Sequence, residues 1–160
     1  METTAARVER RMPDNLIELD RSGLEVLDQE ECLRLLGSAT LGRLGVSIGA
    51  LPVIVPVTYR LVGDRIVFRT GLGTKLDAAT RGSVVAFEVD QVDATSGAGW
   101  SVSVTGLASE VTAIDDLDAS VRADIPRWSH PGGERFTMVS TDMVSGRRIP
   151  SAPPLAAVNG

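Results

Sequence analysis

The amino-acid sequence predicts a mainly β fold, an antiparallel barrel of six to seven strands with short helical inserts. Runs rich in β-branched residues alternate with polar residues along most of the chain, which is the pattern of half-buried strands. Glycines recur inside these runs, as at Gly42 and Gly45, and a glycine within a strand often marks the kind of bend found in barrels. Helix-start signals are confined to short segments between the strands.

Length and composition indicate one domain with an acidic balance. The chain has 160 residues, 43% of them hydrophobic, and 21 Asp and Glu against 16 Lys and Arg give a formal net charge of -5. A general nucleic-acid binder is expected to be basic, so this class is disfavoured. There is no apolar run of membrane-spanning length, no secretory signal pattern, and only one cysteine, Cys32. We therefore expect a cytoplasmic protein without a membrane segment or an internal disulfide.

Residues 21–149 are expected to form the folded domain. Residues 1–20 mix charges with little periodicity and are predicted to be a flexible arm. Residues 150–160 are rich in Pro and Ala and are predicted to be a loose tail.

The first helix of the domain has clear end signals. Asp28 and Glu31 form a capping-box pattern at its start, and Gly37 is predicted to end it. Cys32 lies beside the apolar stripe of this helix, and we interpret it as a small core residue rather than a nucleophile.

A hairpin is predicted over residues 53–70, because Gly63-Asp64 separates two runs of β-branched and aromatic residues. Such a turn would place three pairs on one packing face: Leu61 with Ile66, Tyr59 with Phe68, and Val57 with Thr70. The opposite face is the more polar one and carries Thr58, Arg60, Arg65 and Arg69.

The loop after this hairpin has the residue types of a phosphate site. Gly71-Leu-Gly leads into a short helix with Thr74 as its N-cap, and it brings Thr74 and Lys75 to the same end as Arg69 and Thr70. A lysine at a helix N-terminus is disfavoured by the helix dipole unless an anion also binds there. Two cations, two hydroxyls and loop amides therefore predict an anion site.

The rest of the chain continues the β pattern. Strands are predicted over residues 83–90, 100–111 and 135–140, with a helix over 114–123 and a turn at Ser145-Gly146 before a last short segment, 147–149. His130 is the only histidine, so a zinc site or a histidine-based catalytic triad lacks partners. No metal site is predicted and no catalytic residue is assigned.

Five of these segments, in this order, resemble the pyridoxamine 5′-phosphate oxidase-like family, whose members form the FMN-binding split β-barrel. They are Pro-Val-Ile-Val-Pro-Val-Thr-Tyr, Ile-Val-Phe-Arg-Thr, Gly-Leu-Gly-Thr-Lys, Val-Ala-Phe-Glu-Val-Asp and Gly-Trp-Ser-Val-Ser-Val-Thr-Gly. The resemblance covers about residues 25–149. It implies a homodimer with FMN at the subunit interface and an oxidoreductase that acts on a small molecule.

The resemblance also implies which residues contact the cofactor. By position, the flavin phosphate would meet Arg69, Thr70, Thr74 and Lys75. The isoalloxazine ring would meet the backbone of Val55, Pro56, Val57 and Thr58. A contact from the partner subunit would come from Trp100 and Ser101.

Two alternatives stay open from the sequence. Related split barrels hold a deazaflavin in the same groove, and its longer acidic tail would need further basic residues, for which Arg43 and Arg60 are the candidates. A protein that binds a flavin or haem without turnover is the other alternative.

Overall fold

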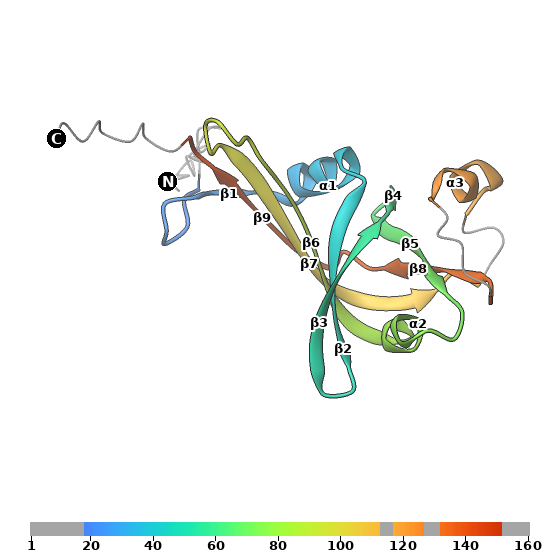
Figure 1. The fold of residues 1–160 in the computed structure, drawn as a ribbon. Coiled ribbons are helices and arrows are strands. Elements are labelled where there is room, and N and C mark those ends of the chain that lie inside the picture. The colour runs from blue at the N-terminus through green and yellow to red at the C-terminus, as the bar shows by residue number, and fades with distance from the viewer. Residues whose placement is uncertain (1–17, 113–116, 127–131, 152–160) are drawn as a thin grey trace, which may run out of the picture.

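The computed structural model describes residues 18–112, 117–126 and 132–151, and Figure 1 shows their fold. Nearly all of the predicted N-terminal arm and C-terminal tail lies outside these residues. No helix in the described part of the chain is long and apolar enough to cross a membrane. The elements in chain order are β1 (Glu25–Leu27), α1 (Gln29–Ser38), β2 (Leu41–Ile48), β3 (Leu51–Thr58), β4 (Arg60–Val62), β5 (Arg65–Gly71), α2 (Lys75–Thr80), β6 (Ser83–Val92), β7 (Gly99–Glu110), α3 (Ala119–Asp124), β8 (Glu134–Val139) and β9 (Met143–Ile149).

The strands form one antiparallel sheet that curls without closing. Its hydrogen-bonded path runs β3-β2-β6-β7-β8-β5-β4, and β9 pairs with both β7 and β1. β3 and β4 therefore stand at opposite ends of the path although they are neighbours in sequence. Figure 1 shows the β2–β3 hairpin projecting from the body of the molecule, and α3 beside β5 and β8. The prediction of a mainly β, split antiparallel barrel with short helical inserts is confirmed.

The predicted central hairpin is correct at its turn and wrong along its length. β4 and β5 meet at Gly63, which has a φ of 61°, and Leu61 pairs with Ile66 as expected. The ladder covers only three residues of β4, because the strand is interrupted at Tyr59 and β3 pairs with β2 instead. The sheet therefore lacks the two other expected pairs, Tyr59 with Phe68 and Val57 with Thr70.

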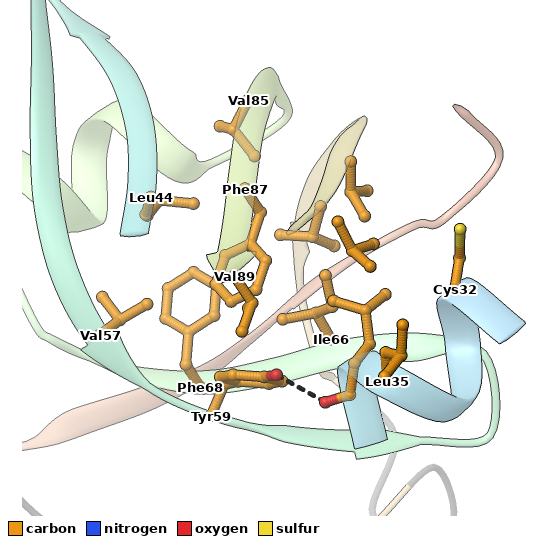
Figure 2. Close-up of a cluster of buried hydrophobic side chains, with 14 of the residues drawn as sticks. Cys32, Leu35, Leu44, Val57, Tyr59, Ile66, Phe68, Val85, Phe87 and Val89 are labelled. Carbon is orange, nitrogen blue, oxygen red and sulfur yellow. Dashed lines mark hydrogen bonds between the residues drawn. The ribbon is translucent and has the colours of Figure 1, made fainter. Parts of the chain in front are cut away.

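Tyr59 fixes the point at which the chain changes its pairing partner. Its amide donates to the Thr40 carbonyl at 2.9 Å, and its hydroxyl donates to the Leu36 carbonyl at 2.5 Å. The ring is fully buried and meets Phe87 edge-on, with the ring centroids 4.9 Å apart (Figure 2). These contacts tie the corner to the end of α1, so that the residues before it follow β2 and the residues after it follow β5.

α1 begins as predicted and extends past its predicted end. The Asp28 carboxylate accepts a hydrogen bond from the Glu31 amide at 2.8 Å, which confirms the N-cap. The helix continues through Gly37 to Ser38, because Gly37 does not adopt the left-handed conformation that ends many helices. Cys32 is 1% exposed within the core, as expected, and burial raises the pKa of its thiol.

Two predictions for the C-terminal third are wrong in extent. β9 runs unbroken through the turn expected at Ser145-Gly146. A Cβ at Gly146 would lie 2.6 Å from the Cys32 Sγ, so this glycine permits close packing against α1 rather than a turn. α3 is shorter than the helix expected over 114–123 and is capped by Asp118, while residues 113–116 lie outside the described part.

Alkaline titration should test the role of Tyr59. Burial raises the pKa of this phenol to about 12, whereas Arg60 lowers it slightly. Between the unfolded-state pKa near 10 and this value only the unfolded chain ionises, so stability should fall by roughly 1.4 kcal/mol per pH unit above pH 10. Tyr59→Phe should remove this part of the alkaline loss and cost about 1–3 kcal/mol at pH 8, because the Leu36 carbonyl loses its donor.

Urea unfolding of both proteins at pH 8, 10 and 11 measures these differences. Tyr59 is the only tyrosine, so absorbance at 295 nm follows its ionisation directly. Parallel alkaline losses in the two proteins would show that Tyr59 ionises normally in the folded state.

Candidate functional site

A pocket of about 460 Å³ lies between β3 and the end of β5. It occupies the gap that the expected pairing of Val57 with Thr70 would have closed. Its wall is largely apolar with a few polar groups, which is the usual character of a small-molecule site. Seven of the ten residues predicted to bind the cofactor border it; the full lining is Val55, Pro56, Val57, Thr58, Arg69, Thr70, Gly71, Thr74, Leu76 and Glu134.

β3 presents the edge of the sheet to this pocket. Ile48 and Leu51 flank the two-residue turn of the β2–β3 hairpin, so they form a hydrogen-bonded pair, and alternate residues from there bond to β2. The peptide groups of Pro52 and Pro56 then face the open edge, where a missing N–H removes no ladder bond. The edge beside the pocket therefore combines carbonyl acceptors with apolar side chains.

Arg69 borders the pocket, but its guanidinium group anchors α3. Nε donates to the Ile125 carbonyl at 3.0 Å, Nη2 donates to the Arg122 carbonyl, and Nη1 lies 3.4 Å from Glu134 Oε2. The guanidinium carbon lies 4.4 Å from the centre of the Phe136 ring, and the side chain is 7% exposed. An anion in the pocket would have to compete with Glu134 for Arg69.

A buried carboxylate, Asp77, lies behind the pocket wall and is 1% exposed. Its oxygens accept from the Thr70 hydroxyl at 3.2 Å and from the Gly73 amide at 3.0 Å. Two guanidinium groups balance its charge, with Arg135 Nε 2.6 Å and Arg81 Nη2 3.0 Å from the carboxylate oxygens. Burial alone raises the pKa of Asp77, but the Gly73 amide and the neighbouring charges outweigh this effect, and the pKa is lowered from its usual value of 3.8.

Both predicted hydroxyl donors are engaged inside the protein. The Thr70 hydroxyl has one proton, and it points to Asp77 because an ionised carboxylate can only accept. The Thr74 hydroxyl donates to the Gly71 carbonyl at 2.8 Å and, as the predicted N-cap of α2, accepts from the Asp77 amide at 3.1 Å. These hydroxyls therefore shape the loop instead of offering protons to the pocket.

Lys75 is the cation at this end of the molecule that forms no ion pair with the described residues. It directly follows Thr74 and is exposed. Four cations at this end face three carboxylates, which leaves one net positive charge in an otherwise acidic chain; they are Arg69, Lys75, Arg81 and Arg135 against Asp77, Glu110 and Glu134.

Trp100 and Ser101 lie at the start of β7, outside the lining of this pocket. Trp100 is 8% exposed and packs in the main hydrophobic core of the chain. Ser101 is on the opposite face of β7, in register with Asp90 and Arg147.

The chain matches a family model described as pyridoxamine 5′-phosphate oxidase over residues 28–148, from the start of α1 into β9. It belongs to this family. An uncharacterized protein of Mycobacterium tuberculosis is 38% identical over 128 residues, which cover 77% of this chain and 84% of that protein.

Solved structures of similar proteins share the fold. The FAD binding protein from Mycobacterium smegmatis is 32% identical, with a TM-score of 0.70 over 79% of this chain and 99% of that one. A putative pyridoxamine 5′-phosphate oxidase from Corynebacterium glutamicum is 24% identical, with a TM-score of 0.66 over 81% of this chain and 96% of that one. The second similarity shows the fold alone.

In this member of the pyridoxamine 5′-phosphate oxidase family, sequence reasoning missed Asp77 and Glu134. Asp77 follows a capping threonine at the third helical position, where an acidic residue is usually an exposed complement to the helix dipole. Its burial depends on Arg135, which β8 places opposite Thr70 in the register with β5. The residues around Asp77 give no sequence signal that it pairs with an arginine 58 positions further along the chain.

The two cations predicted to bind phosphate should differ in their effect on stability. Arg69→Gln removes the bonds to the α3 carbonyls and leaves Glu134 without this partner, so it should cost about 2–4 kcal/mol. It should also speed amide hydrogen exchange over residues 118–125. Lys75→Gln is the matched control and should change stability by less than about 0.5 kcal/mol, as expected for an exposed unpaired side chain. Urea unfolding and exchange mass spectrometry give both values; equal stability of the two variants would contradict the anchoring role of Arg69.

Proposed function

We propose that this chain is an FMN-binding oxidoreductase that acts on a small molecule as a homodimer, with the flavin in the pocket between β3 and β5. The observation that carries the proposal is the pocket itself, in which an apolar strand edge meets the glycine loop. Lys75 is not one of the residues lining this pocket, but it directly follows the lining residue Thr74 and is exposed. The family supports the same cofactor class.

The residues of the pocket suit the two ends of a flavin nucleotide. A flat ring with N–H groups suits the carbonyl edge and apolar side chains around Val55, Pro56 and Val57. A phosphate suits the ammonium group of Lys75, and each charge-assisted hydrogen bond contributes roughly 1.5–3 kcal/mol. The flavin, when bound, supplies the hydride or electron chemistry, and the protein binds and orients it.

FAD is a second candidate cofactor. The Mycobacterium smegmatis protein that is 32% identical to this chain is an FAD binding protein. FMN and FAD share the ring, the ribityl chain and the first phosphate, so the same pocket can hold that common part. Mass identification of the chromophore released on heating separates the two.

A deazaflavin is a weaker candidate than a flavin. Its longer acidic tail would need spare cations, and both candidates are paired within the chain. Arg43 lies 3.3 Å from Glu88 and 3.5 Å from Asp90, while Arg60 lies 2.7 Å from Asp124. Binding without turnover is a further alternative, and a chromophore that dithionite bleaches but no physiological reductant reduces would favour it.

The homodimer is supported by an exposed apolar face on the outside of the sheet. The strand register places Ile54, Gly45, Ala86, Thr105 and Met143 in one row across β3, β2, β6, β7 and β9. The two large residues at its ends are 73% and 68% exposed. A contiguous exposed apolar face is typical of protein–protein interaction sites.

Flavin titration tests the cofactor and its phosphate contact. The wild-type protein should bind FMN more tightly than riboflavin, and Lys75→Gln should weaken FMN by about tenfold or more while leaving riboflavin unchanged. Glu134→Gln should instead strengthen FMN binding, because it removes a negative charge from the pocket lining. Flavin fluorescence gives the dissociation constants. Equal affinity of the wild-type protein for FMN and riboflavin would refute the phosphate assignment.

Ile54→Asp should convert the dimer to a monomer. The substitution places a charge at the β3 end of the proposed contact, where burying it without a partner is unfavourable. Light scattering after size exclusion measures the mass. Leu19→Asp is the control for an added surface charge, since Leu19 is 60% exposed and lies before β1, away from that row. A wild-type protein that is monomeric at micromolar concentration would contradict the dimer.

A further inference from the structure

We propose that Asp77 is the positioning residue for the phosphate end of the flavin, because its carboxylate orders the glycine loop on which that phosphate would rest. This inference rests on the proposed function, and it concerns the residue that fixes the shape of the loop in the same flavin site. Asp77 itself faces the loop and the two arginines rather than the pocket.

The loop needs such a tie because two of its residues are glycines. Gly73 has a φ of 73°, in the region that glycine adopts most readily, and an unrestrained glycine loses much conformational freedom when it is ordered. Asp77 holds this loop twice. Its carboxylate accepts from the Gly73 amide, and its own amide donates to the Thr74 hydroxyl, which in turn donates to Gly71.

The same carboxylate connects the loop to the sheet. Its other oxygen accepts from the Thr70 hydroxyl on β5, and that hydroxyl lies 3.2 Å from the Thr137 hydroxyl on β8. One side chain thus joins β5, the loop and α2. Within the pocket lining, the carboxylate holds Thr70 directly. Thr74, and through it Gly71, are held by the Asp77 backbone amide, which substitution by Asn or Glu at this position retains.

A carboxylate near a phosphate site could instead act simply by repulsion. Here its charge is largely balanced, because Arg81 and Arg135 contact Asp77 and Arg135 also contacts Glu110 at 2.6 Å. These four groups sum to zero charge, so the field they project into the pocket is weak. Ordering and repulsion predict opposite effects when the carboxylate is removed, which makes them separable by experiment.

Asp77→Asn in the full-length chain tests the proposal with FMN and riboflavin as the two probes. An amide keeps the shape of the side chain but replaces one carboxylate oxygen with an NH2 donor. Thr70 and Gly73 donate to different oxygens of Asp77, so one of these two hydrogen bonds is lost. The FMN dissociation constant should rise about tenfold, which is close to 1.4 kcal/mol. Riboflavin lacks the phosphate, and its affinity should change by less than about twofold.

Two further variants separate position from charge. Asp77→Glu keeps the charge but moves the carboxylate by one methylene, and it should also reduce the preference for FMN. Arg81→Gln is the matched control, because Arg81 is 56% exposed and both carboxylate bonds to the loop and β5 remain. It should change FMN affinity by less than about threefold. If Asp77→Asn does not fold, Thr70→Val, which removes one donor to Asp77, should lower the FMN preference in the same direction.

The outcomes distinguish this inference from the proposed function. A wild-type preference for FMN over riboflavin that persists or increases in Asp77→Asn overturns the positioning role and leaves the flavin site intact. Parallel losses of FMN and riboflavin affinity overturn it as well, because they indicate a general structural role. A wild-type protein without any preference for FMN refutes the phosphate site and the inference together.

Discussion

The anchoring of Tyr59 to the end of α1 is the constraint from which the candidate site follows. A continuous strand from β3 through β4 could pair with β5 along its whole length and close the sheet. The bonds from Tyr59 to Leu36 and Thr40 hold the corner against α1 instead, so β3 follows β2 away from β5. The gap left between these strands is the pocket. Pro56 then removes a donor at the open edge, which also makes that edge a poorer template for pairing with another strand.

Charge at this site is arranged in two layers. Behind the wall, Asp77 is the anion that organises the glycine loop, and its counterions are the half-buried Arg135 and the exposed Arg81. Its carboxylate stabilises the fold at every pH above the unfolded-state pKa near 3.8, and this contribution is lost as the pH falls through the lowered pKa of the folded state. At the surface, Lys75 has no such partner among the described residues and is free to meet an external anion. An acidic protein can therefore offer a local positive charge without a general basic patch.

The sequence predicted the elements that depend on local chemistry. Asp28 and Thr74 cap their helices as expected, and Gly63 turns the β4–β5 hairpin. It also placed seven of the candidate residues around one pocket. The sequence could not predict contacts between residues that are far apart along the chain and that the pairing of strands brings together. Arg69 looked like a free cation because Arg122 and Ile125, whose carbonyls accept its hydrogen bonds, are more than fifty positions away. Gly146 looked like a turn because the Cys32 sulfur that it accommodates is on another element.

Under the proposed function, cofactor binding and dimer formation become one linked equilibrium. The pocket in a single subunit is open to solvent, whereas tight small-molecule sites bury most of their ligand. A second subunit that covers the remaining face of the ring would bury it and the exposed apolar row together. In such an equilibrium, dimer formation strengthens ligand binding by a certain free energy. The ligand must then stabilise the dimer by the same amount. Ile54, through dimer contacts, and Lys75, through the flavin phosphate, would thus both shift this linked equilibrium although they lie on separate parts of the surface.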